Sequence, residues 1–120
     1  MNIALICDRE KTQATIRFCK KYKDILKYNK IYIPKNLNDN LKNHVKFKLT
    51  ETLYLEEEAK QQILSRIFYG EIDMLLFFRK PKKLEHQEKI DSMLLNLCDE
   101  NLLPYATNFK TAEILLKSLI

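Results

Sequence analysis

The sequence predicts an α/β protein, a three-layer α/β/α sandwich with a five-stranded, mainly parallel sheet. Two observations indicate this class. Short apolar runs alternate along the chain with stretches whose apolar residues recur at helical spacing. The resulting order of strands and helices implies parallel strands joined by right-handed crossovers, with helices on both faces of the sheet. The chain has 120 residues, of which 46% are hydrophobic, so we expect one domain, residues 1–120, with its own core.

The first quarter of the chain predicts a strand, a helix and a second strand. Residues 2–7, "NIALIC", form a short apolar run typical of a buried strand. Asp8 follows as a candidate helix cap. Residues 10–28 then carry apolar side chains at roughly helical spacing. Residues 30–34, "KIYIP", alternate and stop at a proline, as a second strand does.

The next segments predict the sheet edge and a second long helix. Residues 36–44 are rich in asparagine, which indicates a loop or a short helix. Residues 45–49, "VKFKL", alternate apolar and basic side chains, so we expect a third strand at an edge of the sheet. Residues 56–68 return to helical spacing, and Gly70 stands where a helix C-cap is wanted.

The last part of the chain predicts two more strands, each followed by a helix. Residues 72–78, "IDMLLFF", are the most hydrophobic run and predict the central strand. A helix is expected around 89–101, a short strand at 104–108 and a closing helix at 110–120. Ligands of open parallel sheets bind beyond the carboxyl ends of the strands. The residues after each strand are therefore the candidates for a site.

Composition excludes several classes of protein. A single glycine, Gly70, excludes a P-loop and a glycine-rich dinucleotide fingerprint, which both need several glycines near phosphate. No run of about eighteen apolar residues occurs, so no membrane span is expected. The three cysteines are widely spaced and odd in number. They favour free thiols in a reducing cytoplasm over disulfides or a zinc site, and we expect no metal and no cofactor.

Charge favours an anionic partner. There are 21 lysines and arginines against 16 aspartates and glutamates, a net charge of +5. No recognition-helix motif and no RNA-binding aromatic strand occurs, so nucleic acid is not the expected partner. The sequence therefore favours a small anionic metabolite.

Three segments of the chain resemble the methylglyoxal synthase family: "IALICDREK", "GEIDMLLFFRKP" and "LPYATNFKTAE". The resemblance covers nearly the whole chain and implies the methylglyoxal synthase-like fold. The family expels phosphate from dihydroxyacetone phosphate, and the same domain binds regulatory ligands in carbamoyl phosphate synthetase. Because the family assembles as a hexamer, the resemblance also implies a homo-oligomer.

The resemblance assigns roles to residues of this chain. It places the family's catalytic aspartate at Lys60, followed by Gln61, in the segment "LEEEAKQQ". It places the phosphate-binding lysine at Lys11 and the aspartate of the first turn at Asp8. His86 lies one residue from the position of the family's active-site histidine, although a solvated loop histidine explains it equally well.

Other candidate ligand-binding residues follow the remaining strands. Lys35 and its neighbouring asparagines stand where the family has a turn rich in glycine and threonine. Arg79 belongs to a basic run at 79–83, which is either the mouth of the site or a solvated loop. Thr107 and Asn108 are expected at its floor.

The substitution at Lys60 decides between functions. An ammonium cannot accept a proton unless its pKa is strongly depressed, and the glutamates at 56–58 oppose that depression. Those glutamates also suit the first turn of a helix, whose dipole they complement. We therefore expect a protein that binds a small anion without the synthase reaction. The alternatives are an active synthase that uses Asp8 or a glutamate of 56–58 as base, and a module that binds nucleic acid or protein through its basic surface.

Overall fold

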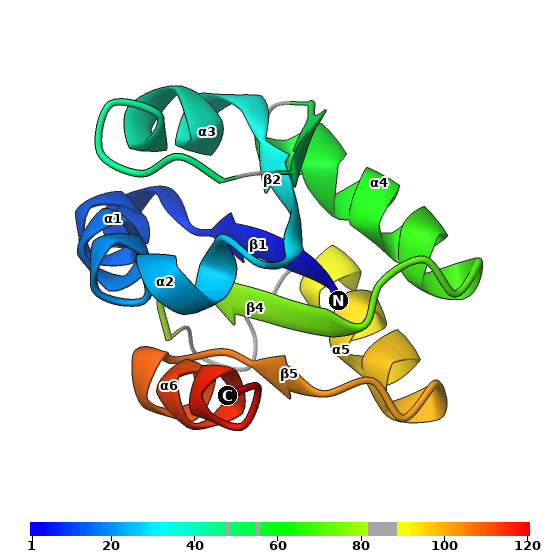
Figure 1. Ribbon diagram of the computed structural model, residues 1–120. Coiled ribbons are helices and arrows are strands. Elements are labelled where there is room, and N and C mark those ends of the chain that lie inside the picture. Colours follow the sequence, from blue (N-terminus) through cyan, green and yellow to red (C-terminus); the bar gives the residue numbers. More distant parts are fainter. Residues whose placement is uncertain (48, 55, 82–88) are drawn as a thin grey trace.

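A single twisted sheet forms the middle layer of the molecule (Figure 1). The computed structural model describes residues 1–47, 49–54, 56–81 and 89–120. The five strands pair in the order β3-β2-β1-β4-β5, and every pairing is parallel. The strands are β1 (Asn2–Cys7), β2 (Lys30–Pro34), β3 (Leu49–Leu53), β4 (Met74–Phe78) and β5 (Tyr105–Ala106).

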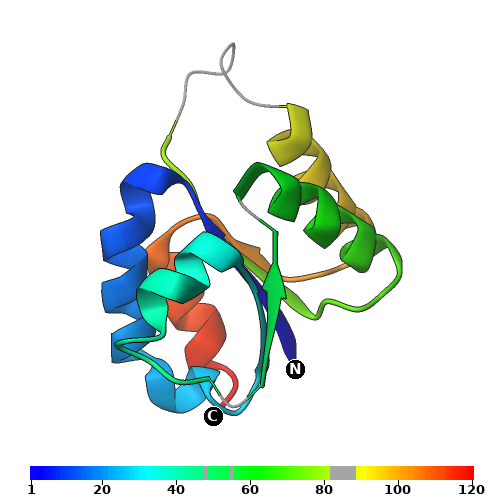
Figure 2. The same ribbon diagram turned by 90° about the horizontal axis from the view of Figure 1, so that it is seen from above.

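Helices cover both faces of this sheet, as Figure 2 shows. One face carries α1, α2, α3 and α6, and the other carries α4 and α5. The helices are η1 (Arg9–Lys11), α1 (Thr12–Lys21), α2 (Lys23–Leu26), α3 (Lys35–Leu41), α4 (Glu56–Phe68), α5 (Lys89–Glu100) and α6 (Phe109–Lys117). The predicted three-layer α/β/α class is confirmed, and the sheet is entirely parallel.

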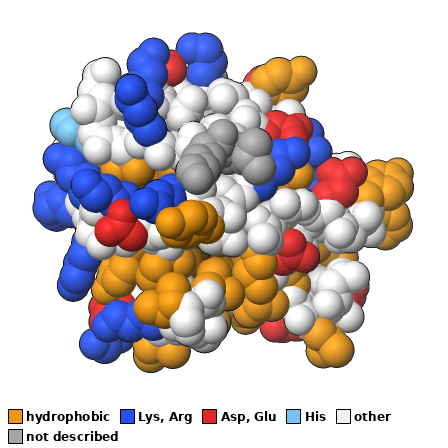
Figure 3. Space-filling model, in the orientation of Figure 1, with side chains coloured by type: hydrophobic (Ala, Val, Ile, Leu, Met, Phe, Trp, Pro, Cys, Tyr) orange, Lys and Arg blue, Asp and Glu red, His pale blue; other side chains and the backbone are white. Residues whose placement is uncertain are grey.

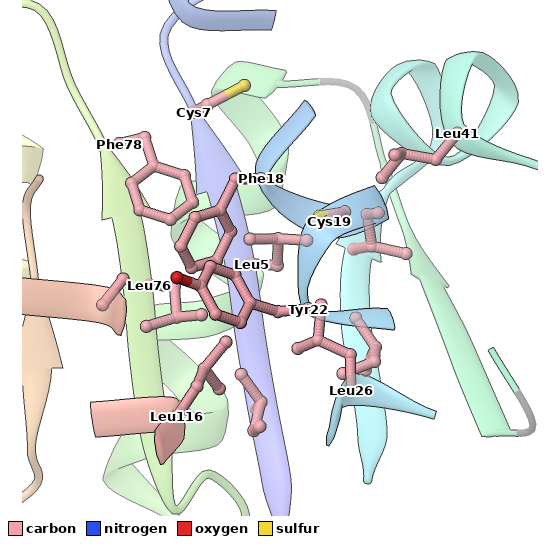
Figure 4. Packing of buried hydrophobic residues seen from close by; sticks show 14 of the residues in the cluster. Leu5, Cys7, Phe18, Cys19, Tyr22, Leu26, Leu41, Leu76, Phe78 and Leu116 are labelled. Carbon is pink, nitrogen blue, oxygen red and sulfur yellow. The ribbon is translucent and has the colours of Figure 1, made fainter. Parts of the chain in front are cut away.

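Successive side chains of the inner strands contribute alternately to the two halves of the core, one on each face of the sheet. Ile3 and Leu5 of β1 pack with α1 and α6, whereas Ala4 and Ile6 pack with α4 and α5. This alternation follows from the two-residue period of a strand. In Figure 4, Phe78 of β4 lies beside Phe18 of α1 in the first of these clusters. Both faces are therefore buried, as a parallel sheet requires.

The third strand begins later than the sequence predicts. We expected residues 45–49, but β3 spans Leu49–Leu53. Val45 is buried in the core cluster that also holds residues of α1 and α3, and Phe47 packs against the same cluster. Their alternation therefore reflects anchoring of the segment after α3. The predicted edge position is correct, because β3 pairs only with β2 among the described strands.

Two smaller expectations also change. The predicted helix at 10–28 is interrupted at Tyr22, between α1 and α2. The hydrophobic run at 72–78 was expected to form the central strand. Its residues Met74–Phe78 form β4, which lies next to the central strand β1. All five residues of β4 are buried, so its apolar composition is explained by burial on both faces of the sheet.

Candidate functional site

All the strands of the sheet are parallel, so their carboxyl ends lie along one edge of it, and those of β1 and β4 point to the left in Figure 1. Asp8 follows β1, Lys35 follows β2, Arg79 follows β4 and Thr107 follows β5. Figure 3 shows lysine and arginine side chains gathered on this side of the molecule. Of the basic residues expected around a site, Lys11 and Arg79 reach this edge, where parallel sheets bind ligands.

Four of the predicted ligand-binding residues line one pocket at this edge. The pocket holds about 250 Å³ and lies between the end of β4 and the start of α6. Its cationic side chains are Lys11 and Arg79, and its polar residues are Thr107 and Asn108. Phe78 and Phe109 contribute apolar walls. Two cations in a partly apolar recess form an environment suited to a small anion.

The start of α6 adds donors to this pocket. Asn108 is the N-cap of the helix, and its side-chain oxygen accepts a hydrogen bond of 2.9 Å from the backbone N–H of Thr111. A helix N-terminus carries partial positive charge and backbone N–H groups that lack partners within the helix. Because Asn108 and Phe109 line the pocket, this end of the helix dipole adds to the positive potential there.

Asp8 connects the ends of β1 and β4. It does not cap η1 with its side chain, contrary to our expectation. Its carboxylate instead accepts a hydrogen bond of 2.8 Å from the backbone N–H of Lys80, and its carbonyl accepts one of 2.9 Å from the N–H of Lys11. With a relative exposure of only 7%, Asp8 is a buried carboxylate that fixes the turn carrying Lys11.

Lys60 is buried on the opposite face of the sheet, where α4 meets α5. Its ammonium lies 2.8 Å from a carboxylate oxygen of Asp91, 4.0 Å from one of Asp8, and 5.1 Å from the ring centre of Phe77. Lys60 and Asp91 have relative exposures of 5% and 2%. A buried charge is tolerated when it is paired in this way, so these three side chains form a compact charged cluster.

Asp91 is the site residue that sequence reasoning missed. It lies on α5, on the same buried face as Leu94 and Cys98 three and seven residues later. An acidic residue in phase with the apolar stripe of a helix is the signal that indicates it. The sequence gives no indication of its partner, because Lys60 lies 31 residues away.

Gln61 and Lys35 are not brought to this pocket. Gln61 is exposed and lines a groove between α4 and α5 with Leu64 and Leu97. Lys35 is exposed at the start of α3 and pairs with Asp39 at 3.0 Å. The neighbouring Gln62 instead accepts a hydrogen bond of 2.6 Å from the backbone N–H of Tyr54, which ties α4 to the end of β3. We therefore leave Gln61 and Lys35 out of the proposed site.

The remaining candidates are the histidine and the glutamates. His86 lies outside the described residues, as do Lys82 and Lys83 of the basic run. Of the three glutamates at 56–58, the side chain of Glu58 is described, and it is exposed at the start of α4. The position of this triplet fits the acidic first turn of a helix.

The described ranges lack two further features. No group of three or more histidine, cysteine, aspartate or glutamate side chains there is arranged to hold a metal ion. In the same ranges, no helix has the length and apolar character needed to cross a membrane.

Curated relatives match this chain almost from end to end. The methylglyoxal synthase of Caldicellulosiruptor saccharolyticus is 35% identical over 119 residues, which cover 99% of this chain and 84% of that protein. The chain belongs to the methylglyoxal synthase family. The methylglyoxal synthase of Acholeplasma laidlawii is 33% identical and is covered to 98% of its length. That of Lysinibacillus sphaericus is 34% identical and is covered to 89%.

Solved structures agree with the family fold. The crystal structure of methylglyoxal synthase from Elizabethkingia anophelis superimposes with a TM-score of 0.82 at 21% identity, and the match covers 96% of this chain and 76% of that one. No family model matches the chain. Membership of the methylglyoxal synthase family therefore follows from the whole-length relatives, and the structural match supports the arrangement of strands and helices.

Proposed function

We propose that this member of the methylglyoxal synthase family binds a small phosphorylated metabolite at the carboxyl edge of its sheet, without efficient synthase turnover. One observation carries the second half of this proposal. The position at which the family resemblance places a proton-accepting aspartate holds the buried ammonium of Lys60, 2.8 Å from Asp91.

The charges around Lys60 favour its protonated form. Carboxylates of Asp91 and Asp8 lie 2.8 and 4.0 Å from its ammonium. These two carboxylates stabilise the positive charge of the ammonium. Removing its proton would leave both of them buried without a compensating charge. A protonated amine cannot take a proton from carbon. Loss of a general base costs a factor of roughly 10²–10⁴ in rate.

The binding half of the proposal is supported by the pocket between β4 and α6. Lys11, Arg79 and the N-terminal end of α6 supply positive charge and hydrogen-bond donors around about 250 Å³. A phosphate group needs such donors, which form charge-assisted hydrogen bonds with its oxygens. A metabolite the size of a triose phosphate is our expected occupant.

Binding can be tested with glycerol 3-phosphate and dihydroxyacetone phosphate. A ligand that binds only the folded protein raises its melting temperature, so both compounds should raise it, and calorimetry should give a 1:1 complex. The variants Lys11→Gln and Arg79→Gln should each weaken binding about tenfold, as expected for loss of one charged contact. Lys20→Gln, at an exposed position of α1 that does not line this pocket, is the matched control. Equal binding by all four proteins would overturn the assignment of the pocket.

An active methylglyoxal synthase is the second candidate, favoured by the names of the relatives at 33–35% identity. Asp8 or Asp91 would then have to act as the base. Methylglyoxal and phosphate released from dihydroxyacetone phosphate should be measured together, at equal enzyme and against an uncatalysed control. We expect turnover near background. Rapid turnover that Asp8→Asn or Asp91→Asn abolishes would replace our proposal with this second one.

A further inference from the structure

A second basic pocket adjoins the one proposed for phosphate. It holds about 400 Å³ between α1 and α6. Arg17 and Lys21 contribute from α1, and Lys110 contributes from α6. Phe109 lines both pockets. We call the two pockets together the basic trough, whose charged side chains are Lys11, Arg17, Lys21, Arg79, Lys110 and Glu113.

An unbroken row of aromatic rings forms the floor of the basic trough. Phe78 stacks on Phe109 with ring centres 4.2 Å apart, and Phe109 lies 5.6 Å from Phe18. Phe18 in turn lies 4.8 Å from Tyr22, and Figure 4 shows Phe18 between Phe78 and Tyr22. The floor therefore joins the two pockets, because Phe109 lines both of them.

The charge of the trough is not balanced from within. Five lysines and arginines line it, against one carboxylate among its described lining residues, Glu113. Glu113 lies 2.9 Å from Lys117 and 4.0 Å from Lys110, so it offsets only part of this charge. Within the ranges that the structure describes, Lys11 and Arg17 pair with no carboxylate. Cations gathered around an apolar floor create a positive potential that favours an anionic ligand.

We propose that the basic trough binds a sugar-sized metabolite with two phosphate groups. One phosphate lies between Lys11 and Arg79, and the second lies against Arg17, Lys21 and Lys110. The sugar spans the apolar floor over Phe109. A single triose phosphate would occupy only the first pocket and leave the cations of the second unused. This inference rests on the proposed function, since the first phosphate takes the pocket proposed there.

The test compares two sugars that differ by one phosphate, fructose 1,6-bisphosphate and fructose 6-phosphate, by calorimetry on the full chain. We expect the bisphosphate to bind at least about tenfold more tightly, which is the gain from one further set of charge-assisted contacts. Its affinity should also fall more steeply with added salt. The double variant Arg17→Gln/Lys21→Gln should bring the bisphosphate down to the affinity of the monophosphate and leave the monophosphate unchanged. Lys20→Gln on the same helix should change neither.

Three results would overturn this inference, and they differ in what they imply for the proposed function. If both sugars bind equally and the double variant has no effect, the second phosphate site is wrong and the proposed function stands. If neither sugar binds, and glycerol 3-phosphate does not bind either, both proposals are wrong. If a single-stranded oligonucleotide binds more tightly than the bisphosphate and loses affinity in the double variant, the trough serves nucleic acid and the inference is overturned.

Discussion

Lys60 and Asp91 are two charges that the fold holds away from water. Their relative exposures are 5% and 2%, and their charged atoms lie 2.8 Å apart. Removing one partner from a buried pair strands the other, which costs about 3–5 kcal/mol of folding free energy. Asp91→Ala should therefore lower the free energy of unfolding, measured in urea, by about 3 kcal/mol. The lower end of the range applies because Asp8 stays 4.0 Å from the ammonium.

The double variant Lys60→Met/Asp91→Leu is the matched control for this prediction. Replacing both charges with apolar side chains of similar size removes the burial penalty of the pair together with its attraction. Its stability should exceed that of Asp91→Ala, although Asp8 loses the ammonium 4.0 Å away. A double variant that is as unstable as Asp91→Ala would show that the pair contributes through packing, and would contradict our account of the charged cluster.

Glu113 should make the free energy of unfolding depend on pH in the acidic range. The ammonium of Lys117, 2.9 Å away, is the main reason that the pKa of this carboxyl is lowered from 4.5 to about 2. A carboxyl whose pKa is lower in the folded state contributes stability above its unfolded pKa, and this contribution is lost as the pH falls through the folded value.

The window for this loss is therefore pH 4.5 down to about 2. The free energy of unfolding of the parent should exceed that of Glu113→Gln at pH 6, and the difference should shrink across that window. Lys117→Gln, which removes the main cause of the shift, should reduce the same difference. A gap that stays constant down to pH 2 would contradict the assigned ion pair.

Gly70 governs how α4 ends. Its φ of +72° lies in the left-handed region, and a Cβ added there would meet nothing within 4 Å. The cost of a side chain is therefore backbone strain alone. Gly70→Ala should lower the free energy of unfolding by about 1–2 kcal/mol in thermal or urea denaturation. Gly70→Asn should lose less, because asparagine tolerates this conformation better. Equal losses in the two variants would point to a cause other than the angle.

At the scale of elements, local patterns located most helices and strands but not their ends. The helix predicted at 56–68 and the strands predicted at 2–7 and 30–34 agree with α4, β1 and β2, because their periodicity reflects burial against the sheet. The strand at 45–49 was misplaced because Val45 is buried in the core cluster without joining a ladder. Alternating burial is shared by strands and by anchored loops, so the pattern alone does not separate them.

The whole fold protects its cysteine thiols. Cys7, Cys19 and Cys98 are buried and form no disulfide among the described residues, and burial raises the pKa of Cys19 and of Cys98 to about 12. The thiolate is the reactive form, so a disulfide reagent at pH 8 should label the native protein slowly, through opening of the fold. When urea unfolds the protein, all three thiols should react rapidly. Fast labelling of the native protein would contradict the packing of these helices and strands.

Some features of this site follow from the sequence pattern, and others depend on contacts that form only in the folded chain. Periodicity determined the sheet class, and the positions after each strand placed Lys11, Arg79, Thr107 and Asn108 in one pocket. Parallel strands bring their carboxyl ends to one edge whatever their order, so position along the chain predicted these four residues. It did not exclude Lys35, which follows β2 and lies outside the pocket.

The pairing of Lys60 with Asp91 was decided by the tertiary structure alone, across 31 residues of chain. The orientation of Gln61 was decided in the same way, since neighbouring residues of a helix point about 100° apart. Lys60 faces the core and Gln61 faces solvent. Which of two adjacent side chains is turned inward depends on how the helix packs on its sheet, and that contact is long-range.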